Sequence, residues 1–182
     1  SQMAREQMQL RFDFINLYAP DGRLITANWR APDAPGTADP LQPLPTPVPT
    51  DDAANPAAPL ASVALLEATV LLAMAPDLAT RIHIPLVATR GAAPTNRTVE
   101  DRAMVLLSTI PVLGDRGETL GLLRGGVLLN QNLPLIDHIN RIVYPDGSLP
   151  LGSIGTATLF MDDVRITTNV RLFQDRRAIG TR

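Results

Sequence analysis

Residues 155–170 have the sequence GTATLFMDDVRITTNV, and this stretch decides the fold. β-Branched, aromatic and other apolar residues fill both halves of it, which favours extended chain on either side of the acidic pair Asp162-Asp163. A two-residue connection between two such runs is typical of a compact β-hairpin. The pattern therefore predicts two strands, Gly155–Met161 and Val164–Phe173, joined at the two aspartates.

Two further hairpins are predicted upstream. The first joins residues 11–18 to residues 23–28 through Pro20-Asp21-Gly22, whose proline and glycine suit a tight turn. The second joins residues 102–113, a strongly apolar run, to residues 118–130. Hairpins of this kind build an antiparallel sheet, here of about five to six strands.

Helices are predicted between the hairpins. Apolar residues recur at helical spacing in Leu133–Val143. Leu60–Met74 is rich in Ala and Leu and has helical length, and Pro76-Asp77 is a suitable start for a short helix that ends near Ile82. Antiparallel strands with helices packed on them define the α+β class.

The stretch 31–59 differs from the rest of the chain. It holds nine of the 17 prolines, with Ala, Thr and Asp between them. Proline lacks a backbone N–H, so regular structure is disfavoured there. We expect a long exposed loop, inserted into a single domain that spans residues 1–182.

Composition excludes several classes of function. The chain has 182 residues and a net charge of −2, with no basic excess to hold nucleic acid. It has no Cys, which excludes disulfides and thiolate metal sites. No apolar run in the chain approaches the roughly 20 residues that span a bilayer. The ends of the chain suggest a piece of a longer protein, and we expect its membrane anchors to lie outside this piece. All 16 basic residues are Arg, whose planar guanidinium suits carboxylate ligands.

Catalytic and metal-binding patterns are missing from the sequence. No Ser lies in a Gly-x-Ser-x-Gly turn, and His83 and His138 are far apart without neighbouring ligands. Gly121–Gly126 lacks the Lys and the helix that a phosphate loop requires. We therefore expect no enzyme activity, no metal and no cofactor.

Polar residues on otherwise apolar strands are the candidate binding residues. Arg124 interrupts an apolar strand, Arg165 lies between Val164 and Ile166, and Thr158 and Thr168 lie on the last hairpin. A buried Arg is costly unless it is paired. Each of these arginines therefore points to solvent, pairs with a carboxylate, or faces a polar cavity.

The residues 155–170, followed by Arg177-Ala178-Ile179-Gly180-Thr181-Arg182, resemble the C-terminal signature of single Cache sensor domains. Gly125–Asn130 is similar to the strand-to-helix junction of that family, and residues 104–112 fit its preceding strand. Residues 11–25 fit its first hairpin. The resemblance covers most of residues 11–182, and the stretch 31–59 has no counterpart in it.

The resemblance implies a PAS-like fold with a ligand pocket on one face of the sheet. It also implies a periplasmic domain of an inner-membrane receptor, flanked by transmembrane helices and homodimeric in the full-length protein. Histidine kinases and chemotaxis receptors carry such domains, and their ligands are often organic acids or amino acids. The signal would pass to a cytoplasmic output domain.

For the ligand site we predict Arg124, Thr158 and Phe160 as lining residues, with Arg81 or His83 contributing from the segment before the polar loop. Thr168 and Arg165 are further candidates, and Arg165 has the alternative of pairing with Asp162 or Asp163. A second hypothesis for the whole chain is a dimerisation or protein-interaction module that binds a periplasmic partner.

Overall fold

The structure, a computed structural model, describes residues 12–30, 37–38, 40–41, 60–150, 152–172 and 175–182. Most of the proline-rich stretch 31–59 lies outside the described residues. The chain divides into two compact units. Unit 1 comprises the described residues up to Ser62 together with Leu106–Val127, and unit 2 comprises Val63–Val105 and Leu128–Arg182.

Strands and helices mix along the chain as in an α+β fold. The elements are β1 (Phe14–Tyr18), β2 (Leu24–Ala27), β3 (Leu60–Leu66), α1 (Ala68–Met74), the 3₁₀ helix η2 (Pro76–Leu78), α2 (Ala79–Ile82), β4 (Ile84–Pro85), β5 (Val99–Glu100), β6 (Ala103–Leu113), β7 (Thr119–Leu128), α3 (Leu133–Val143), β8 (Thr158–Met161) and β9 (Val164–Thr168). A five-stranded antiparallel sheet has the order β2-β1-β7-β6-β3, which confirms the predicted class and strand number. None of the helices in the described residues is long and apolar enough to cross a membrane.

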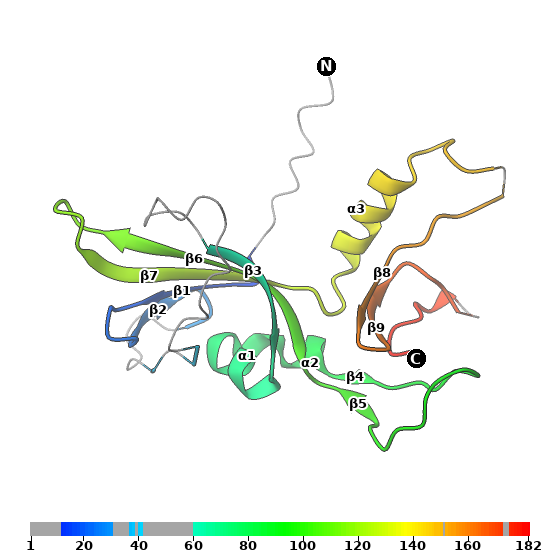
Figure 1. The fold of residues 1–182 in the computed structure, drawn as a ribbon, viewed down its shortest axis with the longest axis horizontal. Helices are drawn as coiled ribbons and strands as arrows, with labels where there is room; N and C mark the ends of the chain where they lie inside the picture. The colour runs from blue at the N-terminus through cyan, green and yellow to red at the C-terminus, as the bar shows by residue number, and fades with distance from the viewer. Residues whose placement is uncertain (1–11, 31–36, 39, 42–59, 151, 173–174) are drawn as a thin grey trace. The chain divides into compact units, whose positions relative to one another are not determined.

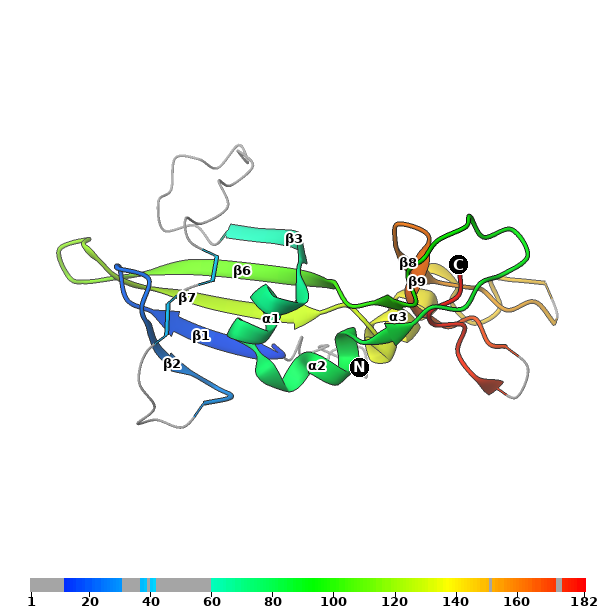
Figure 2. The ribbon, with the colours of Figure 1, turned by 90° about the horizontal axis from the view of Figure 1, so that it is seen from below.

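In unit 1 the side chains of β1 alternate between buried and less buried positions. In β1 the side chains of Phe14, Asn16 and Tyr18 are buried and that of Ile15 is exposed. β1 pairs antiparallel with β2 and with β7, and Asn16 lies opposite Arg124. The strands β1, β2, β6 and β7 lie side by side in both ribbon views (Figures 1 and 2).

The segment Leu60–Met74, predicted to be one helix, is instead a strand followed by a helix. β3 lies at the edge of the sheet beside β6, and the chain becomes helical only at Ala68. Ala and Leu favour a helix by only a few tenths of a kcal/mol per residue. Backbone pairing with β6 outweighs that preference, as tertiary context commonly does.

The core of unit 2 is formed by the last hairpin. Ile84, Met161, Val164 and Ile166 are buried together, and Met104, Leu86, Leu159 and Ile179 pack against them. At roughly 1.5–3 kcal/mol for each fully buried large side chain, this cluster is a major stabilising contribution to unit 2. The stretch that decides the fold in the sequence therefore supplies most of the buried cluster.

The hairpin β8–β9 forms a separate two-stranded sheet and is shorter than the predicted strands. The side chain of Asn169 explains where the pairing ends. Its Oδ1 accepts a hydrogen bond from the backbone N of Ala157 at 2.8 Å, and its Nδ2 donates to the carbonyl of Gly155 at 3.0 Å. The backbone N of Asn169 still donates to the carbonyl of Ala157 at 3.2 Å, and beyond this bond the side-chain amide takes the place of backbone pairing.

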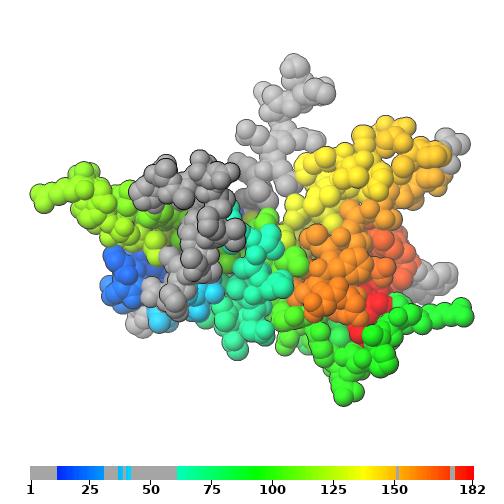
Figure 3. Space-filling view, viewed as in Figure 1, coloured from blue at the N-terminus to red at the C-terminus, as the bar shows by residue number. Residues whose placement is uncertain are grey.

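The last residues of the chain lie between β9 and the segment after β4 (Figure 3). The backbone N of Gly180 donates to the carbonyl of Arg165 at 2.8 Å, and the backbone N of Val87 donates to the carbonyl of Gly180 at 2.8 Å. Thr181 forms a parallel bridge with Val87. The C-terminal residues are therefore held on two sides by backbone hydrogen bonds.

Gly180→Ala should destabilise the protein strongly. Gly180 has φ +81°, and a Cβ there would lie 2.2 Å from the carbonyl oxygen of Pro85. Left-handed backbone and a clash with main chain together should cost roughly 2 kcal/mol or more in urea-unfolding free energy. Gly91→Ala is the matched control, because a Cβ at Gly91 meets nothing within 4 Å. Equal stability of the two variants would contradict this account of the C-terminal residues.

Candidate functional site

The predicted site residues are divided between the two units. Arg124 belongs to unit 1, whereas Arg81, His83, Thr158, Phe160, Arg165 and Thr168 belong to unit 2.

Arg124 lies in a buried polar cluster of unit 1. Its side chain is 1% exposed, and its Nε donates to Thr109 Oγ1 at 3.3 Å. Its guanidinium carbon lies 5.2 Å from the centroid of the Tyr18 ring. The Tyr18 hydroxyl accepts a hydrogen bond from Asn16, whose Oδ1 accepts from Trp29 Nε1 at 3.0 Å. The cation–π contact and this chain of hydrogen bonds stabilise polar groups inside the unit.

The predicted residues of the last hairpin contact one another. The hydroxyls of Thr158 and Thr168 are 2.6 Å apart across the two strands. The Arg165 guanidinium lies 5.3 Å from the centroid of the Phe160 ring, and its NH1 donates to Thr181 Oγ1 at 2.6 Å. These contacts tie the hairpin to itself and to the C-terminal residues.

The carboxylates of the β8–β9 turn are engaged by other arginines. Asp162 accepts a hydrogen bond from Arg102 at 2.7 Å, and Asp163 accepts two from Arg182, at 2.9 and 2.7 Å. The contacts found for Arg165 are thus with Phe160 and Thr181, in place of the ion pair considered from the sequence.

Arg81 and His83 lie in different surroundings. Arg81 NH2 donates to the carbonyl of Leu128 at 2.9 Å, and Gln131 Nε2 donates to the carbonyl of Arg81 at 2.9 Å. Arg81 therefore holds the junction between β7 and α3. His83 is exposed and lines a small pocket of about 130 Å³ together with Gln131 and Arg176.

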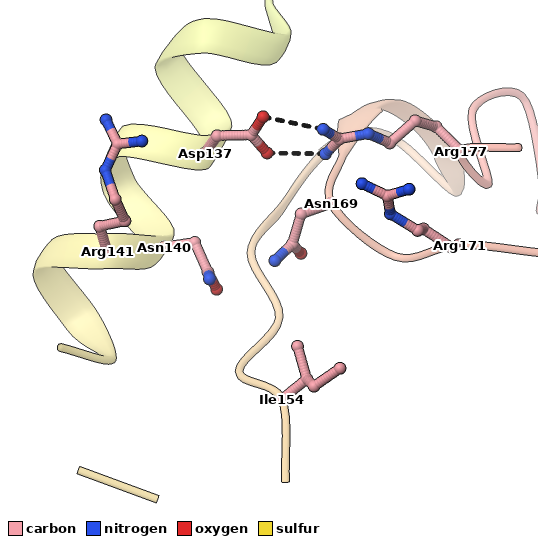
Figure 4. A pocket seen from close by; sticks show the side chains of 7 residues that line it. All are labelled: Asp137, Asn140, Arg141, Ile154, Asn169, Arg171 and Arg177. Atoms are coloured by element: carbon pink, nitrogen blue, oxygen red, sulfur yellow. Dashed lines mark hydrogen bonds and ion pairs between the residues drawn. The ribbon is translucent and has the colours of Figure 1, made fainter. Parts of the chain in front are cut away.

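A larger pocket of about 520 Å³ lies between α3 and the segment that follows β9. Its volume is within the roughly 300–1,000 Å³ that is usual for small-molecule sites. None of its lining residues was among the predicted site residues; they are Asp137, Asn140, Arg141, Ile154, Asn169, Arg171 and Arg177. Figure 4 shows Asp137 and Asn140 projecting from α3 toward the segment that carries Asn169, Arg171 and Arg177.

A paired guanidinium and carboxylate span the larger pocket. Arg177 NH1 and NH2 donate to the two carboxylate oxygens of Asp137 at 2.7 and 2.8 Å, and NH1 also donates to the carbonyl of Thr168 at 3.2 Å. The hydrogen bonds from Arg177 lower the pKa of Asp137 against the opposing effect of burial, and the charges of Arg141 and Arg171 lower it further. Asp137 is therefore ionised and neutralises one of the three arginines of the pocket.

The remaining polar groups of the larger pocket differ in how far their hydrogen-bonding capacity is already used within the protein. Both atoms of the Asn169 amide are used by the backbone of the hairpin. In the part of the chain that the structure describes, the buried Asn140 Oδ1 has no hydrogen-bond partner. Arg171 pairs with Asp175, but the two side chains are 53% and 76% exposed, and such surface pairs contribute little. The pocket therefore offers an exchangeable guanidinium and an unused acceptor.

A smaller pocket of about 260 Å³ adjoins the larger one. The two share Asn140, Arg141 and Ile154 as lining residues. Beyond this shared border, the smaller pocket is lined by Tyr144 and by the loop after α3.

The sequence contained a signal for the α3 side of this site. Asp137, Asn140 and Arg141 are three and four positions apart, so they lie on one face of the helix, away from the apolar residues that identified it. No comparable spacing marks Asn169, Arg171 and Arg177, because their segment follows the end of β9 and the amide of Asn169 redirects it.

A second charged cluster lies near the start of β6. The side chain of Glu100 is buried and accepts hydrogen bonds from Arg97 and from Arg102, the latter at 2.9 Å. Burial raises the pKa of Glu100, but the hydrogen bonds from Arg102 and Arg97 outweigh it and lower the pKa to about 2. Within the described ranges, no group of three His, Cys, Asp or Glu side chains is placed to hold a metal ion.

Comparison with known proteins identifies the C-terminal part of the chain. Residues 127–182 match the family model described as single Cache domain 3. No curated protein and no solved structure matches the chain. All lining residues of both the larger and the smaller pocket lie within the matched residues.

Glu100→Gln should lower stability in a pH-dependent way. Because the folded pKa is about 2 against 4.5 for the free group, the ionised Glu100 stabilises the fold above pH 4.5. That contribution is at most about 3 kcal/mol and is lost as the pH falls from 4.5 through 2. The free energy of unfolding in urea should therefore be higher for wild type than for Glu100→Gln at pH 7, and the difference should shrink as the pH falls from 4.5 through 2. The control Asp115→Asn removes an exposed carboxylate and should change little; a separation that does not depend on pH would contradict the assignment.

Proposed function

The C-terminal part of this chain, residues 127–182, belongs to a single Cache sensor domain, and from this premise we propose that the protein is the extracytoplasmic, ligand-binding part of a transmembrane signalling receptor. Cache domains are commonly extracellular small-molecule sensors and are generally non-catalytic. The observation that carries the proposal is the position of the larger pocket, which lies wholly within the matched residues.

The proposed ligand is a small organic anion, held at Arg171. Arg177 is neutralised by Asp137, and Asp175 engages Arg171 at the surface. Arg141 adds a further positive charge at the border with the smaller pocket. A carboxylate that enters can replace the exposed Asp175 and make the paired hydrogen bonds that a guanidinium favours. The excess of arginine over aspartate in the pocket supports an anion over a cation.

The proposed signal passes through the residues that follow the pocket. Arg171 and Arg177 form an isolated antiparallel bridge, and the chain continues from Arg177 directly into the C-terminal residues held between Arg165 and Val87. A ligand that binds one arrangement of this segment better shifts the population toward it. We propose a periplasmic position, a homodimeric inner-membrane receptor, and an output domain of the histidine kinase or chemotaxis-receptor type.

A second candidate function is a module that binds a periplasmic protein. One observation favours it: Ile142, Val143 and Ile154 in unit 2 are exposed by 66%, 57% and 85%. Large apolar side chains exposed to this degree are available to a protein partner, and interaction surfaces commonly contain such side chains. The measurement below separates the two candidates, because the module requires no small-molecule ligand.

Small carboxylates should stabilise the full chain against heat, and Arg171→Gln should abolish the effect. Saturating a site at a hundred times its Kd adds about 2.7 kcal/mol, which is a shift of several degrees in Tm for a chain of this size. A thermal-shift screen with lactate, malate, succinate and glutamate measures it. Arg90→Gln is the matched control, because it removes an equal charge from an exposed loop position.

The same screen on Arg124→Gln tests the residue predicted from the sequence. If the ligand binds at the larger pocket, a folded Arg124→Gln keeps the shift. Loss of the shift in Arg124→Gln but not in Arg171→Gln would contradict the pocket assignment. The absence of any shift in well-folded wild type would favour the protein-binding module.

A further inference from the structure

The smaller pocket extends the proposed ligand site. It shares Asn140, Arg141 and Ile154 with the larger pocket, so the two pockets are neighbours along this border. A ligand that reaches across this border meets the lining residues of both pockets. The lining of the smaller pocket therefore indicates which chemical groups the ligand has beyond its carboxylate.

The extension is built from uncharged hydrogen-bonding groups and one acid. Ser148 and Ser153 contribute hydroxyls, each able to donate and accept, and Asp146 contributes a carboxylate. All three are exposed, so a ligand reaches them without displacing a buried contact. A second carboxylate on the ligand is disfavoured here, because it would meet Asp146.

An aromatic ring forms another part of the wall. Tyr144 lines the smaller pocket, and its ring lies against the backbone of Gly155: a Cβ at Gly155 would be 2.2 Å from Tyr144 Cδ2. Gly155 is buried and its lack of a side chain is what allows the ring to sit there. An aromatic surface beside hydroxyl groups suits a ligand with both C–H faces and hydroxyls.

The border between the pockets requires a hydrogen-bond donor. Among the described residues, Asn140 Oδ1 is buried without a partner, and a buried acceptor without a donor is costly. The ligand group nearest to it, between the carboxylate and the distal end, should therefore carry an O–H or N–H. A plain aliphatic acid fails this requirement.

From these observations we infer that the ligand is a polyhydroxylated carboxylate, of the sugar-acid class. This inference rests on the proposed anion site at Arg171. The carboxylate is held at Arg171, a hydroxyl donates to Asn140 Oδ1, and the remaining hydroxyls bind Ser148, Ser153 and Asp146 beside the Tyr144 ring. The closest competitor is a basic amino acid, whose distal ammonium would pair with Asp146.

Isothermal titration of the full chain with matched probes tests the inference. The probes are D-glucuronate, D-galacturonate and D-gluconate, against glucose, hexanoate, lactate and lysine. At least one sugar acid should bind about tenfold or more tighter than each of the other probes, because a site built to hydrogen-bond hydroxyls rejects analogues that lack them. If lactate or lysine binds as tightly as every sugar acid, the sugar-acid inference is wrong, whereas the proposed anion site at Arg171 is not contradicted.

Variants separate this inference from the proposed function. The double variant Ser148→Ala/Ser153→Ala should weaken the sugar acid about tenfold and leave lactate within about twofold, since it removes only distal hydrogen bonds. Tyr144→Leu should act in the same direction. Arg171→Gln should weaken every anion. If no carboxylate binds at all, the proposed function fails; if the distal variants affect lactate and the sugar acid equally, the sugar-acid inference alone fails. Unchanged far-ultraviolet circular dichroism and thermal midpoint without ligand establish that each variant is folded.

Discussion

The paired hydrogen bonds between Arg177 and Asp137 are the interaction on which the geometry of the larger pocket depends. They join α3 to the segment after β9, and Arg177 also donates to the carbonyl of Thr168 at the end of that strand. Two parallel N–H···O bonds fix both the distance and the orientation of the partners, which a single contact does not. The same pair neutralises one arginine and leaves the others to set the charge of the pocket. Removing either partner would leave a half-buried charge and release one wall, so the geometry of the site and its electrostatics have a common cause.

Arginine–aspartate contacts also organise the other end of unit 2. The two aspartates of the β8–β9 turn point to different partners: Asp162 to Arg102, just before β6, and Asp163 to Arg182, at the C-terminal end. The hydrogen bonds that Arg182 donates lower the pKa of Asp163. The hydrogen bonds that Arg102 donates to the carboxylates of Glu100 and Asp162 raise the pKa of Arg102. Asp162 and Asp163 are 62% and 47% exposed, so each pair alone contributes little energy. Their effect is geometric, because one tight turn fixes two segments that are distant in the sequence.

The sequence predicted the local elements well where one signal dominated. The turn Pro20-Asp21-Gly22 identified the hairpin of β1 and β2, and helical spacing of apolar residues identified α3. The edge strand β3 was missed because its Ala and Leu residues carry no alternation and its pairing partner β6 lies about 40 residues further along the chain. The pocket was missed for a related reason. Its two walls come from α3 and from the segment after β9, and nothing in the spacing of Arg171 and Arg177 shows that they face Asp137.

The strand arginines chosen from the sequence illustrate the limit of arguing from burial cost alone. A buried Arg does need a compensating group, and Arg124 has part of its compensation in Thr109 and the Tyr18 ring. The compensating group can be a ligand or the protein itself, and burial alone does not distinguish the two. In contrast, Arg171 lies outside the strands and is 53% exposed, and it pairs with Asp175, which is 76% exposed. A receptor site needs a charge whose partner is easily exchanged, since binding energy spent on breaking an internal pair is lost to affinity. By this criterion the exposed Arg171 is better suited to exchange its partner for a ligand than an arginine fixed within a sheet. Arg171 is bridged to Arg177, which leads into the C-terminal residues, so an exchange of partners at Arg171 can shift the conformation of those residues.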